Sequence, residues 1–413
     1  MTEAFADAIE VTPANKSQLL AGAPFHFRLA SNIAERLHYG ALVFVLPDGR
    51  ALRFSGAEAT GALGIIEVKD YNFAWRAVFG GGIGFYESYA AGQWDSPDIT
   101  DVLYVFAKNA DYVNEALAAS PAYRFLKQIR HKLRRNTREG AKRNIMAHYD
   151  LGNSFYEKWL DRSMTYSSAK FNSPGEDLMA AQRNKYESLA RSIGLKEGES
   201  ILEIGSGWGG FAEFAAKEAG AKVTGLTISP SQYNYAKERI FREGLSERVD
   251  FRLQDYRDAN GHYDKIASIE MFEAVGKEYW PTYFGKVRDL LKPGGAAGLQ
   301  IITIADRFFE GYSRSTDFIQ QYIFPGGMLP GPSILRQEIE KAGLVWKNGV
   351  AFGQDYARTL SEWRNRFLAS WDDIQPMGFD DRFKKLWRYY LSYCEAGFKA
   401  ATTDVIQVEL AKA

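Results

Sequence analysis

One short stretch constrains this chain more than any other: an apolar run that ends in an acid and passes directly into three alternating glycines. The stretch is Ile201–Phe211, ILEIGSGWGGF. Gly205, Gly207 and Gly209 allow a sharp turn where a strand hands over to a helix, and they let a ligand contact bare main chain. A tight turn in any α/β protein is the simpler interpretation. The helix-forming residues 211–217 that follow favour a nucleotide-type binding site.

The position of the acid separates this motif from the dinucleotide fingerprint G-x-G-x-x-G. Glu203 lies before the glycines, on the predicted strand. The pattern E-x-G-x-G-x-G resembles motif I of the class I S-adenosylmethionine methyltransferases. The resemblance implies that Glu203 accepts a hydrogen bond from the amino group of the methionine part of the cofactor. It also implies that Gly205, Gly207 and Trp208 form the cofactor turn.

Length and charge limit the classes of function. A chain of 413 residues is long for one core and predicts two or three packed units. Its 51 Lys plus Arg balance 51 Asp plus Glu, so the overall charge does not favour a nucleic-acid partner. A single cysteine, Cys394, excludes an intramolecular disulfide, and no signal peptide or membrane-spanning apolar run is visible, so we expect a cytoplasmic protein. The five histidines lack metal-ligand spacing, and we expect no metal site.

Residues 1–112 predict a separate small α/β domain. Apolar runs at Ala41–Leu46 and Leu52–Phe54 flank a turn and form a hairpin pattern, and Leu63–Val68 predicts another strand. Residues 75–89 mix aromatic side chains with four glycines, which favours a loop packed under a helix. No catalytic constellation occurs in this part, so we expect an accessory, lipid-associated role.

A basic segment follows, within a predicted helical linker over residues 113–144. Between positions 124 and 143 a single acid, Glu139, accompanies these basic residues: Arg124, Lys127, Arg130, Lys132, Arg134, Arg135, Arg138, Lys142 and Arg143. A solvated linker is one interpretation of such a charge run. Adsorption to an anionic membrane surface is the other, because each basic residue near the headgroups contributes about 1 kcal/mol.

The stretch Met146–Phe171, MAHYDLGNSFYEKWLDRSMTYSSAKF, carries a more specific resemblance. It resembles the segment before the catalytic core in the cyclopropane fatty acid synthases and their mycolic acid relatives, which follows the pattern YD-L-G-N, W/L-D and Y-S-C-A. The similarity continues through Val223–Gln232 and Phe318–Pro330. Residues 145–413 are thereby identified as a Rossmann-like class I methyltransferase domain with helical insertions. In the last part, aromatic residues at helical spacing over Ser361–Phe398 predict two packed helices.

The resemblance assigns further cofactor contacts to positions in this chain. Thr227 and Gln232 stand where the family contacts the ribose, and Asp255 and Tyr256 where it contacts adenine. A surface turn is the alternative for Tyr256. The remaining cofactor candidates, from the segment before the core, are Tyr149, Tyr166 and Ser167.

The same resemblance implies a catalytic pocket that binds bicarbonate as the base. In the family a Cys, a Glu, a His, a Tyr and a backbone amide form this pocket. Glu273 and Tyr356 match the Glu and the Tyr, Ser168 stands at the Cys, Gln300 at the His, and Ile302 at the backbone contact. Serine and glutamine can still donate hydrogen bonds to an oxyanion, so bicarbonate is not excluded.

These substitutions, together with Ala274 beside Glu273, leave the base and the ring-closing step open. The implied function is S-adenosylmethionine-dependent methylation of a carbon in an unsaturated fatty acyl chain of membrane phospholipid. The product is a cyclopropane or a methylene- or methyl-branched chain without a ring. In the second case, Glu273 or Tyr356 takes the proton or stabilises the cation.

Two other classes of function compete with this interpretation. One is a methyltransferase for a small-molecule N or O nucleophile, and the other is a lipid-binding relative without catalysis. The acyl-chain interpretation predicts peripheral association with the membrane from the cytoplasmic side. The sequence leaves a homodimer open.

Overall fold

The computed structural model describes residues 8–112 and 151–412. These residues form two compact units. The first combines residues up to 142 with Phe379–Thr402, and the second combines residues 143–378 with 403–413. The predicted linker over 113–144, the basic segment and Tyr149 lie outside the described residues.

The first unit is built on a five-stranded sheet with the order β1-β3-β2-β4-β5. Strands β2 and β3 are antiparallel, with Ala41 opposite Ser55 and Val45 opposite Ala51, so the predicted hairpin is present. The predicted strand at 63–68 is the end of β4, which pairs in parallel with β2. The strands are β1 Ile9–Glu10, β2 Tyr39–Val45, β3 Ala51–Ser55, β4 Glu58–Val68 and β5 Trp94–Asp95.

Residues 75–89 form a helix, so the expected loop is wrong. They belong to α3, Asn72–Ala90, whose axis is interrupted at Gly81, where φ is +62°. The glycine run had favoured a loop, but Phe85, Tyr86 and Tyr89, which follow the glycines, are buried on a kinked helix instead. The other helices of the N-terminal stretch are α1 Lys16–Leu19, α2 Phe25–Ala34 and α4 Ile99–Lys108.

The last helix, α18, Asp381–Lys399, belongs to the first unit. This differs from the expectation of one methyltransferase domain over 145–413. The reason is packing: Tyr389 lies against Tyr86 and Tyr89 of α3, with ring centroids 5.1 and 5.8 Å apart. Arg388 also donates to the carbonyl oxygen of Ser96. A helix therefore returns from late in the chain to complete the N-terminal core.

The second unit is built on a seven-stranded sheet with the order β11-β12-β10-β9-β6-β7-β8. Strands β6 to β10 are parallel, and β12 is antiparallel to both of its neighbours. The chain enters the sheet at β6 and then crosses to either side of it, which makes the end of β6 the topological switch point. The strands are β6 Ser200–Ile204, β7 Lys222–Thr227, β8 Val249–Leu253, β9 Tyr263–Ile269, β10 Leu291–Ile304, β11 Leu344–Ala351 and β12 Thr403–Lys412.

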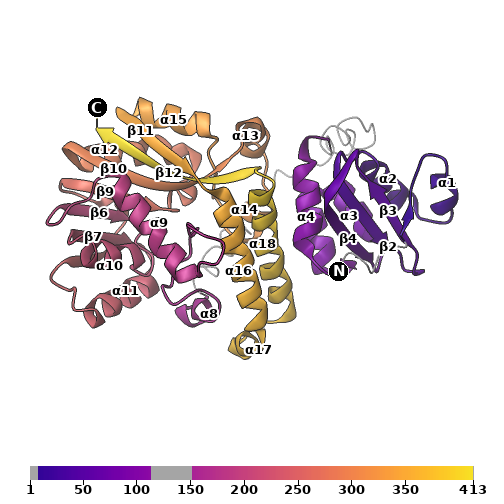
Figure 1. Cartoon of the computed structure of the whole chain (residues 1–413), viewed down its shortest axis with the longest axis horizontal. Coiled ribbons are helices and arrows are strands. Elements are labelled where there is room, and N and C mark those ends of the chain that lie inside the picture. The colour runs from indigo at the N-terminus through magenta and orange to yellow at the C-terminus, as the bar shows by residue number, and fades with distance from the viewer. Residues whose placement is uncertain (1–7, 113–150, 413) are drawn as a thin grey trace. The chain divides into compact units, whose positions relative to one another are not determined.

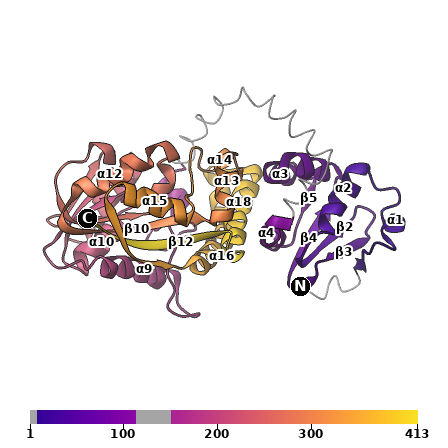
Figure 2. The ribbon, with the colours of Figure 1, turned by 90° about the horizontal axis from the view of Figure 1, so that it is seen from above.

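Helices cover both faces of this sheet, as the Rossmann-like prediction requires (Figure 1). Alternating strand residues divide between two apolar clusters: Ile201 packs with α9, α10 and α11, whereas Leu202 packs with α12 and α15. Figure 2 shows α9 and α12 on opposite sides of β10 and β12. These helices are α9 Leu178–Ser192, α10 Gly210–Lys217, α11 Pro230–Arg242, α12 Trp280–Leu290 and α15 Pro332–Lys341.

The remaining elements of the second unit are short or follow the sheet. They are α8 Asn153–Glu157, α13 Asp306–Ser313, α14 Phe318–Tyr322, α16 Gly353–Ala369, α17 Trp371–Ile374 and the 3₁₀ turns Tyr256–Asp258, Phe272–Ala274, Lys277–Tyr279 and Gln375–Met377. Helix α16 brings Tyr356 and Trp363, both buried, into the second unit.

Candidate active site

The glycine-rich turn lies at the switch point of the sheet. Strand β6 ends at Ile204, and Gly205, Gly207 and Gly209 have φ values of +83°, +51° and +83°. Only glycine adopts this backbone region without strain. A Cβ at Gly205 would lie 2.7 Å from the side chain of Met271, so this position also requires glycine for lack of space. The turn therefore exposes main chain at the carboxyl ends of the parallel strands.

Glu203, the penultimate residue of β6, presents a buried acceptor just before the glycines. The residue is 3% exposed, and its Oε2 has no hydrogen-bond partner among the described residues. Burial raises the pKa of Glu203 well above its usual value, and the charges of Lys185 and Arg239 oppose this. A bound ammonium group would satisfy the free oxygen and stabilise the carboxylate.

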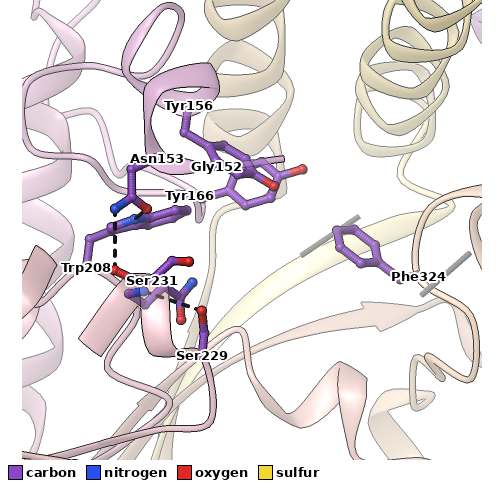
Figure 3. Close-up of a pocket in the computed structure, with 9 residues that line it drawn as sticks. Gly152, Asn153, Tyr156, Tyr166, Trp208, Ser229, Ser231 and Phe324 are labelled. Atoms are coloured by element: carbon purple, nitrogen blue, oxygen red, sulfur yellow. Dashed lines mark hydrogen bonds between the residues drawn. The ribbon is translucent and has the colours of Figure 1, made fainter. Parts of the chain in front are cut away.

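A pocket opens beside this turn and draws its lining from four parts of the chain (Figure 3). Three predicted cofactor residues, Tyr166, Trp208 and Gln232, line it. Trp208 Nε1 donates to Asn153 Oδ1 at 2.8 Å, which joins α8 to the glycine turn. The sequence interpretation missed six lining residues: Gly152, Asn153, Tyr156, Ser229, Ser231 and Phe324. The G-N step of the YD-L-G-N pattern was the available signal for the first two.

Thr227 and Gln232, the two residues matched to the ribose contact, lie together. Thr227 ends β7 and donates to Gln232 Oε1 at 3.0 Å, and Ser229 caps the helix that carries Gln232. Asp255 and Tyr256 are not among the residues that line this pocket. The Asp255 carboxylate is bound by Arg257 at 2.7 Å, and Tyr256 packs against Tyr283 with ring centroids 5.5 Å apart.

A second centre lies at the ends of β9 and β10, and its focus is Glu270. Its Oε1 accepts from the backbone N–H of Ser168 at 2.8 Å and from Gln300 Nε2 at 2.7 Å. Its Oε2 accepts from the hydroxyl of Tyr356 at 2.6 Å. Gln407 donates to Gln300 Oε1, so the amide nitrogen of Gln300 is the atom that faces Glu270. Three segments distant in sequence thus hold one carboxylate.

The structure therefore brings three catalytic candidates, Ser168, Gln300 and Tyr356, around a residue to which the sequence interpretation assigned no role. Ser168 also acts differently from the expectation. Its hydroxyl donates to the carbonyl oxygen of Ala169, and it is the backbone N–H that reaches Glu270. The signal in the sequence was the acid itself, placed directly after the apolar strand β9.

Glu273 and Ile302 form a separate pair next to this centre. The N–H of Ile302, expected at the backbone contact to bicarbonate, donates instead to Glu273 Oε1 at 2.5 Å. Glu273 Oε2 is buried and has no hydrogen-bond partner among the described residues. Burial, followed by the negative charge of Glu270, raises the pKa of Glu273 to about 8. Glu273 is thus mainly protonated at neutral pH.

Lys185, on α9, is a buried basic residue whose charge interacts with both Glu203 and Glu270. It is 0% exposed, and its Nζ donates to the hydroxyl of Ser167 at 2.7 Å. Burial lowers the pKa of Lys185 to about 7, and the charges of Glu270, Asp161 and Glu203 oppose this shift. Ser167, a predicted cofactor residue, therefore connects the lysine to the segment that also carries Tyr166 and Ser168.

Aromatic rings link the cofactor pocket to the Glu270 centre. Tyr166 lines the pocket and lies 5.3 Å from the ring centroid of Trp363. Trp363 in turn meets Tyr356 edge-on at 6.1 Å. Ring faces stabilise nearby positive charge and exclude water. These rings are therefore suited to a reaction in which positive charge develops on an apolar substrate.

Known proteins similar to this chain agree with this interpretation of the site. Residues 136–408 match the family model described as mycolic acid cyclopropane synthetase. The chain belongs to this family. It is 38% identical over 337 residues to the tuberculostearic acid methyltransferase UfaA1 of Mycobacterium tuberculosis, covering 79% of this chain and 78% of that one. It is 35% identical over 354 residues to a cyclopropane-fatty-acyl-phospholipid synthase of Escherichia coli, covering 83% and 86%.

A solved structure of the family has the same architecture. Mycolic acid cyclopropane synthase CmaA1, determined with SAH and CTAB, superposes with a TM-score of 0.61 at 27% identity and covers 65% of this chain and 96% of its own. As a member of the mycolic acid cyclopropane synthetase family, the chain is an S-adenosylmethionine-dependent methyltransferase with the predicted Rossmann-like fold.

The residues of this chain fit the methyl donor of the family but not its bicarbonate. Glu203 has a buried acceptor without a partner, and the glycine turn exposes main chain beside it. At the second centre, the donors that a bicarbonate needs already bind Glu270, and Ile302 N–H already binds Glu273. Among the described residues, no cluster of three metal-binding side chains occurs.

Proposed function

We propose that this enzyme methylates a double-bond carbon of an unsaturated fatty acyl chain carried by membrane phospholipid, and that the product is methylene-branched, without a ring. The observation that carries the proposal is the carboxylate of Glu270, held by three donors and connected to the cofactor pocket by packed aromatic rings. The printed names of the two relatives refer to a fatty acid and to a fatty-acyl phospholipid, which supports an acyl substrate.

The residues of the cofactor pocket have a positioning task. S-adenosylmethionine supplies an electrophilic methyl group on a sulfonium, and the π pair of the alkene forms the new C–C bond as the C–S bond breaks. Glu203 and the main chain at Gly205 and Gly207 orient this donor. An isolated alkene is a weak nucleophile, so alignment and exclusion of water account for much of the acceleration.

The residues around Glu270 have an electrostatic task. Methyl transfer leaves positive charge on the second alkene carbon, in surroundings formed by Tyr166, Trp363 and Tyr356. The faces of these rings and the negative carboxylate of Glu270 lower the energy of that cation. A soluble amine or alcohol needs no such support, because its lone pair accepts the methyl without forming a carbocation. This favours a carbon acceptor over an N or O acceptor.

The product follows from what happens to the cation. Proton loss from the new methyl closes a ring if the cation stays in place, and leaves a methylene branch if a hydride first shifts from the methylated carbon. Both oxygens of Glu270 already accept hydrogen bonds that stabilise the charged form, which slows proton transfer to them, so the hydride shift has time to occur. Conversion of the methylene-branched product to a methyl-branched saturated chain needs two further electrons and two protons, and hence a separate reductase.

Labelled methyl transfer tests the proposal. The purified protein, labelled S-adenosylmethionine and vesicles of unsaturated phospholipid are incubated, and fatty acid methyl esters are analysed by mass spectrometry. We expect label in the acyl chains, in a product that adds hydrogen under mild conditions. A product of equal mass that resists hydrogenation is a cyclopropane and contradicts the branched product. Label only in soluble amines or alcohols contradicts the acyl substrate, and cofactor binding without transfer supports the lipid-binding alternative.

A phospholipid substrate also requires access to a membrane surface. No helix among the described residues is both long and apolar enough to cross a membrane. The basic segment 124–143, which lies outside the described residues, supplies the expected anionic-surface contact. Co-sedimentation with anionic vesicles that weakens at high salt supports this contact, whereas equal binding to neutral vesicles contradicts it.

A further inference from the structure

We propose that the Glu270 carboxylate is itself the proton acceptor of the reaction, so that this enzyme works without bicarbonate. The inference rests on the proposed methylation of an acyl double bond. It names a catalytic residue for that reaction and removes a co-reactant that the family resemblance implies.

The contacts of Glu270 carry the argument. The residues matched to the bicarbonate shell include Ser168, Gln300 and Tyr356, and each donates to one carboxylate, that of Glu270. Both carboxylate oxygens are engaged, as the oxygens of a bound anion would be. A bicarbonate in addition would lack these donors and would lie beside a second negative charge, which is unfavourable.

The backbone at Glu270 shows that this placement is specified. Its φ is +48°, in the left-handed region where a non-glycine residue costs on the order of 1 kcal/mol. Among the described residues only Met164 and Ala401 are other non-glycine residues with positive φ. The strained conformation lies directly at the end of β9 and turns the side chain toward Ser168, Gln300 and Tyr356. Strain of this kind persists where surrounding contacts hold it, and it gathers at functional sites.

The charges around Glu270 suit a base that is ionised before the reaction. Lys185 is the buried cation whose charge favours the Glu270 carboxylate. Glu273 is mainly protonated at neutral pH, so the two neighbouring acids do not repel as two full charges. Burial raises the pKa of Glu270, whereas Tyr356, Lys185, Ser168 and Gln300 stabilise the charged form.

The step balances without any further reactant. A C–H bond of the transferred methyl breaks, its proton binds an Oε of Glu270, and its electron pair forms the second bond of the methylene group. If no hydride has shifted, the same pair closes the ring instead. Glu270 becomes neutral, and the positive charge on the substrate disappears. Release of the proton to water restores the carboxylate.

Bicarbonate dependence and two substitutions test the inference. With bicarbonate removed by degassing, the wild type keeps its rate, and adding bicarbonate changes it less than twofold. Glu270→Gln keeps the shape but cannot accept a proton, and we expect its rate to fall about 100-fold or more. Glu270→Gly suits the local φ and frees the three donors, so added bicarbonate or formate restores at least about tenfold of its lost rate. The exposed Glu238→Gln serves as the control for a change of one charge.

A binding measurement gives a readout that does not depend on turnover. Carbon-13 NMR of labelled bicarbonate shows saturable binding to Glu270→Gly and none to the wild type or Glu270→Gln. Calorimetry with S-adenosylhomocysteine verifies that each variant folds and retains its cofactor pocket.

Two outcomes overturn the inference while the proposed function stands: a wild type that methylates lipid only with bicarbonate, or a Glu270→Gln variant with the wild-type rate. Bicarbonate binding to the wild type at the Glu270 centre also overturns it. A wild type that transfers no methyl to any acyl chain, with or without bicarbonate, overturns the proposed function and the inference with it.

Discussion

Two regions of the second unit are built in opposite ways: the glycine turn with Glu203, here called the cofactor end, and the Glu270 centre, here called the acidic end. At the cofactor end, one continuous stretch of eleven residues supplies the strand, the acid and the glycine turn. At the acidic end, Ser168, Glu270, Gln300 and Tyr356 come from four separate segments and meet only through side chains and one backbone N–H. The first end depends on local backbone geometry, and the second depends on tertiary contacts. Substitutions should therefore affect the two ends by different mechanisms.

Lys185→Met should have the largest effect, because Lys185 influences both ends. Its loss leaves the buried acids Glu203 and Glu270 without their common cation. We expect a loss of about 3 kcal/mol in the free energy of unfolding, a Tm lower by roughly 6 °C or more. Thermal unfolding at pH 7 measures this.

The same variant separates the two ends by pH. Since Lys185 favours the Glu270 carboxylate, its removal raises the pKa of Glu270 and moves the acid limb of the pH–rate profile to higher pH by about one unit or more. An unchanged limb together with an unchanged Tm contradicts the shared role of Lys185.

Gly205→Ala should come next and should act at the cofactor end. Its φ of +83° disfavours a side chain, and a Cβ would collide with Met271. Gly207→Ala is the matched control, because it has positive φ but no atom within 4 Å of the added Cβ. We expect about 2 kcal/mol weaker binding of S-adenosylhomocysteine for Gly205→Ala and about 1 kcal/mol for Gly207→Ala. Calorimetry that finds equal losses contradicts the close approach of Met271.

Tyr356→Phe should act at the acidic end and leave the cofactor end unchanged. It removes the hydroxyl that donates to Glu270 Oε2. Because that bond favours the charged form, its loss raises the pKa of Glu270, and the rate at a given acidic pH falls. We expect roughly a tenfold lower kcat, an acid limb at higher pH and an unchanged affinity for S-adenosylhomocysteine. A weaker affinity contradicts the independence of the two ends.

Glu273→Gln comes last because it should act only on the pH dependence of stability. The folded-state pKa of about 8 lies above the unfolded value of 4.5, so the folded protein binds the extra proton between these values and loses stability as pH rises through this window. The amide cannot ionise. Between pH 5 and pH 9 the stability of the variant relative to the wild type should therefore rise by roughly 4 kcal/mol. Equal Tm values at both pH values contradict the raised pKa of Glu273.

The sequence predicted well wherever a property is local. The strand–turn–helix around Gly205 and the hairpin of β2 and β3 each involve residues close together in the chain. It failed for residues 75–89, where aromatic packing outweighs glycine composition and forms the kinked helix α3. It also missed α18, because no local pattern states which of two cores a helix joins.

The candidate site shows the same division. The sequence identified Ser168, Gln300, Tyr356, Glu273 and Ile302 by resemblance, and the structure brings them into one region. Only the structure distinguishes the roles of the two acids. Glu270 and Glu273 are three residues apart, but the left-handed backbone at Glu270 directs its carboxylate to three donors.

By itself, the sequence determined the class of this protein: a methyltransferase whose donor site follows from one acid and alternating glycines. Backbone conformation at a tight turn depends on the residues of that turn, so it is encoded within a few positions. The tertiary structure decided which carboxylate the three donors hold. Hydrogen bonds to Glu270 come from segments that meet only after the sheet has assembled, and the burial that sets its charge exists only in the folded protein.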